Sequence, residues 1–230
     1  MKKIKRELDR SEIIKNLNLF KKDRKPHERY ASFDYCFNYF QGFKNKEEIA
    51  HDANIQNSCL QLGFYLASWG MYRGSTFLLQ KSVKVFEPLV KYIASGECDA
   101  WGIDVDNYTE ENIKKLISCA ERIERELKIH ETKNATDTLV TKIMLGVFGC
   151  VPAFDTYFKA GSNLGTFNKY ALEQISFFYK DHHTVVDNAA QIKTLSYNES
   201  RETQRFYTKA KIIDMIFFQK GFEEDEPKKS

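Results

Sequence analysis

Apolar residues recur at steps of three and four along most of the chain, which is the spacing of one face of an α-helix. The segment 30–40 carries an aromatic stripe at this spacing: Tyr30, Phe33, Phe37 and Phe40. The segment 110–129 carries a longer apolar face: Ile113, Leu116, Ile117, Ala120, Ile123 and Leu127. Neither the alternating pattern of a strand nor an Asn-Gly hairpin signal is found. The pattern therefore predicts an all-α protein, an irregular multi-helix orthogonal bundle of about eight to ten helices with essentially no sheet.

The helical pattern divides the chain into three parts. Residues 1–25 hold ten Lys and Arg against four Asp and Glu, with apolar residues at nearly helical spacing, and predict a basic amphipathic helix. This helix either docks on the body of the protein or forms an arm that binds nucleic acid or a partner. Residues 26–222 are expected to form one helical domain with a possible subdomain break near 97–108, and residues 223–230 a flexible tail. Thr109 marks one helix start, and Thr136 or Asp137 the next.

The segment 57–77 is strongly apolar and predicts a central helix. Gly63, Gly70 and Gly74 recur at steps of seven and four, so we expect them to line a close contact with another helix. Trp69 is expected to be largely buried there. Arg73 is the one full charge of the segment, and it either reaches solvent, pairs with a structural carboxylate or binds a ligand.

Composition narrows the functional classes. The 230 residues are 42% hydrophobic with a net charge of +3, which is typical of a folded protein and permits, without requiring, binding to nucleic acid. No apolar run approaches the roughly 18 residues of a membrane span, and no secretory signal is recognised. Five scattered cysteines predict reduced thiols and a cytoplasmic protein. The common nucleotide-binding, zinc-protease and hydrolase motifs are absent from the sequence, and we expect no cofactor or metal.

Two features are candidates for DNA binding or catalysis. Arg201, Arg205 and Lys209 would share one face of a predicted helix and could follow a phosphate backbone, although an ordinary solvated face explains them as well. The stretch 141–161 places Gly146 and Gly149 in an apolar run, followed by Pro152 and Asp155. In structural terms, Gly149 would end one helix, Pro152 would begin the next, and Asp155 would lie in its first turn.

The same stretch resembles the DNA-binding hairpin of the helix-hairpin-helix DNA glycosylase superfamily. The resemblance covers about 20 residues around 139–158, and the glycines here read Gly-Val-Phe-Gly rather than the Gly-x-Gly of that superfamily. It implies that backbone N–H groups at Gly146 and Gly149 hold a phosphate, that Lys142 is a nucleophile, and that Asp155 stabilises positive charge on the sugar of a flipped nucleotide. The favoured hypothesis is therefore a helical DNA-interacting protein, for which the resemblance implies base excision as one activity. The alternative is a non-enzymatic module for protein association or homo-oligomerisation.

Overall fold

The computed structural model describes residues 4, 8–74, 76–128, 135–199 and 201–225, and within these ranges it is an all-α fold with one small hairpin. The α-helices are α1 (Arg10–Lys22), α2 (Ala31–Gly42), α3 (Ile55–Ser68), α4 (Glu87–Ala94), α5 (Glu110–Lys128), α6 (Asp137–Phe148), α7 (Thr156–Ser162), α8 (Lys169–Ala189) and α9 (Lys209–Asp225). Four short 3-10 helices are η1 (Lys46–Ala50), η2 (Phe77–Gln80), η3 (Val83–Phe86) and η4 (Val105–Asn107). The strands are β1 (Lys193–Leu195) and β2 (Glu202–Phe206). The fold class predicted from periodicity is confirmed.

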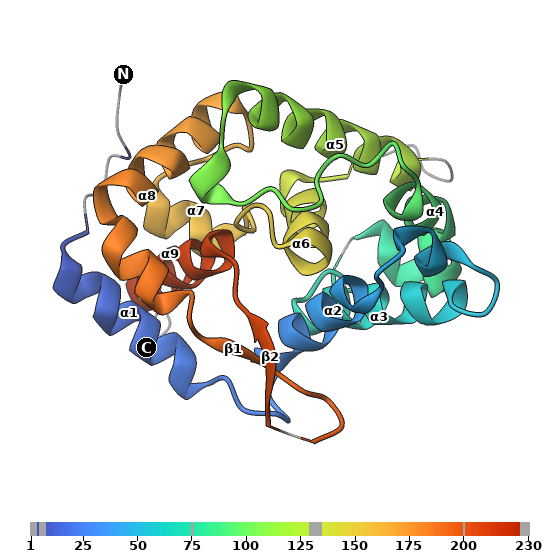
Figure 1. Cartoon of the computed structure of the whole chain (residues 1–230), viewed down its shortest axis with the longest axis horizontal. Coiled ribbons are helices and arrows are strands. Elements are labelled where there is room, and N and C mark those ends of the chain that lie inside the picture. The colour runs from blue at the N-terminus through green and yellow to red at the C-terminus, as the bar shows by residue number, and fades with distance from the viewer. Residues whose placement is uncertain (1–3, 5–7, 75, 129–134, 200, 226–230) are drawn as a thin grey trace.

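Helix α6 is the centre of the molecule. Every residue from Leu139 to Phe148 is buried, and the helix packs against α2, α3 and α5. Figure 1 shows α6 surrounded by the other helices, with α5 along one side and the β1–β2 hairpin protruding at the opposite side. Thr136 caps the start of α6 by accepting the N–H of Leu139, as its position in the sequence predicts.

The basic N-terminal segment contains helix α1, which packs on α9 and α8. Its apolar face is buried through Ile13, Leu17 and Phe20, and Asp9 and Glu12 form a reciprocal capping box at its start. The charged face remains exposed, as an amphipathic surface helix requires. Residues 1–3 and 5–7 of the predicted arm, and 226–230 of the predicted tail, lie outside the described residues.

The predicted central helix over 57–77 is shorter than expected, because α3 ends at Ser68. Gly70 has a φ of +76° and ends the helix in a Schellman turn, in which Gly70 N–H donates to Ala67 and Met71 N–H donates to Leu66. Of the three glycines, Gly63 packs closely against Val83, whereas Gly74 is exposed with open space beside it. The prediction of one glycine-lined helix contact is therefore wrong for Gly70 and Gly74, whose role is backbone conformation.

Strand β2 of the β1–β2 hairpin occupies the first part of the helix that was predicted to carry Arg201, Arg205 and Lys209. Arg201 precedes strand β2, Arg205 lies within it, and α9 begins at Lys209. These three residues therefore do not share a helix face. A buried carboxylate holds the hairpin to α2: Asp34 accepts the N–H of Leu195 at 2.8 Å and the hydroxyl of Tyr207 at 2.5 Å, with Arg24 at 3.8 Å. The two hydrogen bonds to Asp34 join residues more than 160 positions apart, which local sequence patterns do not encode.

Two glycines allow α7 and α9 to touch backbone to backbone. A Cβ atom on Gly161 would lie 2.1 Å from the carbonyl oxygen of Phe217, and one on Gly221 would lie 2.0 Å from that of Tyr157. Neither distance is possible for a real side chain, so the contact requires glycine at both positions. This contact sets the position of α7, whose first residue follows Asp155.

Substituting either glycine with alanine should separate α7 from α9. We expect Gly161→Ala and Gly221→Ala each to lower the free energy of unfolding by about 1–3 kcal/mol or more, as overpacking does. The matched control is Gly42→Ala at the end of α2, where no heavy atom lies within 4 Å of the added Cβ; it should be neutral or stabilise by about 0.4–1 kcal/mol. Urea unfolding of the three variants measures this, and equal stability of all three would contradict the packing.

Asp34 should make stability depend on pH. Burial raises the pKa of Asp34 from 3.8 to about 6, although Arg24, Tyr207, Leu195 N–H and Lys211 all favour the ionised form. Because the folded value lies above the unfolded one, protonation favours folding: the gain is complete below pH 3.8 and is lost as pH rises through about 6. Relative to Asp34→Asn, the wild type should therefore gain stability between pH 7 and pH 4. A difference in unfolding free energy that stays constant across this range would contradict the assignment.

Candidate active site

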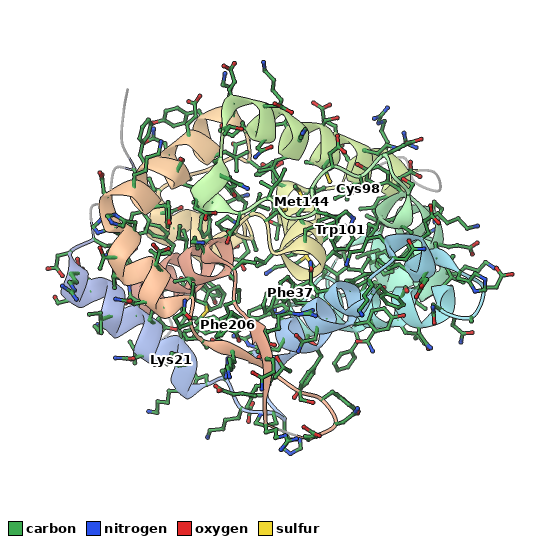
Figure 2. The ribbon with its side chains drawn as sticks, viewed as in Figure 1. Lys21, Phe37, Cys98, Trp101, Met144 and Phe206 are labelled. Carbon is green, nitrogen blue, oxygen red and sulfur yellow. The ribbon has the colours of Figure 1, made fainter. Side chains whose placement is uncertain are left out.

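The turn after α6 is packed into the interior. Gly149 ends the helix with a φ of +68°, and its N–H donates to the carbonyls of Met144 and Leu145. A Cβ on Gly149 would lie 2.8 Å from both Phe37 and Thr208, and one on Gly146 would lie 2.4 Å from the ring of Tyr65. Figure 2 places Phe37 and Met144 in the interior beside this turn. The predicted phosphate contact at Gly146 and Gly149 is therefore wrong: both glycines are packing residues, enclosed by side chains.

The segment 150–155, between Gly149 and α7, is held on both sides. Phe154 N–H donates to the hydroxyl of Thr141 on α6 at 2.8 Å, and Ala153 N–H donates to Asp214 on α9 at 3.0 Å. Pro152 lies within this segment and does not begin a helix. Asp155 is the N-cap of α7 and accepts the N–H of Phe158 at 3.0 Å through one carboxylate oxygen. Its other oxygen is thereby directed to a different partner.

That partner is Lys142 of α6, so the two predicted catalytic residues lie together. The Nζ of Lys142 lies 2.8 Å from Oδ2 of Asp155. Only 4% of the Lys142 side chain is exposed, against 13% of Asp155. An ammonium group at this depth needs a carboxylate, because an unpaired charge away from water is strongly unfavourable.

A second buried pair, which sequence analysis missed, lies beside the first. The Nζ of Lys211 lies 2.8 Å from Oδ2 of Asp214, with the two side chains 2% and 7% exposed. The ammonium is enclosed by aromatic rings, 4.7 Å from the centroid of Phe33 and 4.8 Å from that of Phe20. A Lys and an Asp three residues apart within the apolar run of α9 would have been the signal for this pair.

Trp69 connects the two pairs to the surface. Its ring centroid lies 4.8 Å from the Nζ of Lys142 and 5.9 Å from that of Lys211. Tyr30 and Phe218 pack edge-on against the ring at 5.5 and 5.6 Å. Trp69 is partly buried and packs against the core, consistent with the prediction that it is largely buried, and its Nε1 is enclosed without a hydrogen-bond acceptor among the described residues. Buried donors without a partner are rare in folded proteins.

The remaining predicted residues lie elsewhere or make other contacts. Arg73 is exposed and its side chain folds over Gly70, beside Trp69. Arg201 pairs with Glu199, and Arg205 donates to the carbonyl of Asn38 at 3.4 Å. Lys209 pairs with Asp106 at 2.9 Å. Of the basic residues considered from sequence, Lys142 and Arg73 therefore belong to the Trp69 region, whereas the 201–209 group does not.

Comparison with known protein families, with curated proteins and with solved structures finds no match to this chain. The chemistry of the site is therefore argued from its own residues. Within the described residues, no cluster of three or more His, Cys, Asp or Glu side chains is placed to hold a metal ion, and none of the helices has the length and apolarity needed to cross a bilayer.

The ion pair itself can be tested by a double-mutant cycle. Asp155→Asn keeps a good N-cap but leaves the Lys142 ammonium without its carboxylate, so we expect it to lower the free energy of unfolding by about 3–5 kcal/mol. Adding Lys142→Met should recover part of that loss. The control, Asp9→Asn, changes an exposed N-cap of α1 and should have little effect. Additive losses from Lys142→Met and Asp155→Asn in urea unfolding would show that the two groups do not interact.

Proposed function

We propose that this protein excises a base from DNA, with Lys142 as the attacking amine and Asp155 as its proton acceptor. The observation that carries the proposal is a buried amine with one carboxylate partner, 4.8 Å from the ring centroid of a partly exposed tryptophan. A buried lysine that faces one carboxylate and a partly exposed aromatic ring is a candidate site for covalent catalysis by the amine. Lys142 and Asp155 are also the two residues to which the sequence resemblance assigns catalysis, whereas Gly146 and Gly149, which carry the rest of that resemblance, are packing residues.

The 2.8 Å hydrogen bond gives the pair a route to a neutral amine. Asp155 takes a proton from the Lys142 ammonium, which frees the nitrogen lone pair. The amine then attacks C1′ of a flipped nucleotide, and the bond between C1′ and the base breaks with its electron pair leaving on the base, which takes the proton held by Asp155. The attached nitrogen then loses a proton to Asp155, and its lone pair forms the C=N bond to C1′ as the bond from C1′ to O4′ breaks. Asp155 passes this second proton to O4′.

Trp69 supplies the surface on which a flipped base would stack. Stacking on an aromatic side chain contributes about 1–3 kcal/mol per base and tolerates any base, because every base has a π-face. Tyr30 and Phe218 pack against the ring in T-shaped contacts, which position it before a ligand arrives.

The alternative function, protein association, is supported by a smaller feature. Leu60 and Phe64 lie one turn apart on α3 and are 44% and 69% exposed. Such a pair could contact another protein, but it places no charged or nucleophilic group beside the contact. We therefore favour the enzymatic proposal, which uses both the buried pair and the tryptophan.

Reduction by borohydride tests the mechanism directly. Wild type mixed with end-labelled duplexes that contain an abasic site, 8-oxoguanine or uracil should form a covalent adduct in the presence of borohydride, which reduces the C=N bond. Lys142→Arg keeps a cation against Asp155 but provides no nucleophile, and Lys142→Gln removes the charge; both should lose the adduct. Asp155→Asn should slow its formation by about 100-fold, a typical effect of losing a general base.

Lys91→Gln is the matched control, because Lys91 is an exposed lysine of α4 that pairs with Glu87. It should trap DNA like wild type. Circular dichroism of each variant establishes that the fold is kept. Equal trapping by wild type and Lys142→Arg, or no adduct with any of the three duplexes, would overturn the proposed function.

A further inference from the structure

We propose that Arg29 and Arg73 bind the two phosphate groups that flank the nucleotide stacked on Trp69. This inference rests on the proposed function and adds the part of the substrate that the buried pairs do not contact. Phosphates carry most of the affinity in protein–DNA complexes, and arginine is well suited to bind them because its planar guanidinium can donate two parallel hydrogen bonds.

Arg29 lies over the outer part of the site. Its guanidinium carbon is 5.5 Å from the ring centroid of Trp69 and 5.3 Å from that of Tyr30. The residue is exposed and has no carboxylate partner within the described part of the chain. Cation–π contacts of this kind at an exposed position are weak, which leaves the guanidinium able to move toward an arriving anion.

Arg73 approaches the same tryptophan from the turn that ends α3. A Cβ on Gly70 would lie 2.8 Å from Nε of Arg73 and 3.0 Å from its guanidinium carbon, so the side chain folds back over the residue next to Trp69. Gly70 and Gly74 both have positive φ, which makes the turn that directs Arg73 this way. Like Arg29, it is exposed and forms no ion pair with another described residue.

The charges around Trp69 explain why these two residues, and not the lysines, would meet phosphate. Lys142 and Lys211 are buried and each is neutralised by its own aspartate. Arg29 and Arg73 therefore supply the unneutralised positive charge at the exposed side of the ring. Two guanidinium groups beside one aromatic surface fit a nucleotide, whose base stacks on the ring while the phosphates on either side contact the guanidinium groups.

The salt dependence of DNA binding measures these contacts. We would titrate fluorescein-labelled duplex containing a tetrahydrofuran abasic analogue with wild type, Arg29→Gln, Arg73→Gln and the double variant, by anisotropy at several salt concentrations. Each lost phosphate contact should reduce the slope of log K against log salt by about one. Arg125→Gln is the control, because Arg125 is an exposed arginine of α5 and no ion pair joins it to another described residue.

The outcomes separate this inference from the proposed function. A slope that falls by about two in the double variant and is unchanged in Arg125→Gln supports the phosphate contacts, even if borohydride traps no adduct and base excision fails. A slope that stays at the wild-type value in the double variant overturns the phosphate contacts, even if trapping through Lys142 succeeds. Absence of wild-type binding at low salt overturns both.

Discussion

Two lysine–aspartate pairs in an aromatic interior are the constraint on which the rest of this structure depends. Removing each ion from water costs several kcal/mol, and only close geometry recovers that cost. The protein supplies the geometry from three elements: α6 carries Lys142, α9 carries Lys211 and Asp214, and the N-cap of α7 carries Asp155. The backbone contact of Gly161 with Gly221 and the hydrogen bond from Ala153 to Asp214 bring these elements together. Well-packed apolar residues would often be as stable, so stability alone gives no reason for four buried charges.

Local signals were enough to predict much of the fold and part of this site. Amphipathic spacing predicted the helices, and Thr136 and Thr109 were placed at helix starts because N-capping involves neighbours two or three residues away. Lys142 and Asp155 were both predicted as site residues. They form an ion pair because only the end of α6 and one short segment separate them in the sequence. The prediction that Gly146 and Gly149 hold a phosphate was wrong, because glycine is equally suited to a phosphate-binding turn and to a tight helix contact.

The features that sequence did not reveal are set by contacts between distant residues. The 201–206 region became a strand because Asp34, Arg24 and Tyr207 hold the hairpin against α2, and no window of sequence contains these partners. Gly161 and Gly221 lie 60 residues apart, so the sequence did not predict that they meet in one helix contact. Spacing alone predicted such a contact for Gly63, Gly70 and Gly74. The burial of Lys211 was not predicted, because it depends on Phe20, Phe33 and Trp69 from other elements.

The surroundings of Lys142 bring the proposed chemistry and the proposed base-binding surface to one side chain. The Lys142 ammonium lies 2.8 Å from its carboxylate partner, Asp155, and 4.8 Å from the centroid of the Trp69 ring, whose π-face stabilises a cation. A proton moved along the hydrogen bond to Asp155 would convert the ion pair into a neutral pair with no change in net charge. A base stacked on Trp69 would contact the same ring as the ammonium, so substrate binding and release of the amine's lone pair would be linked through one tryptophan.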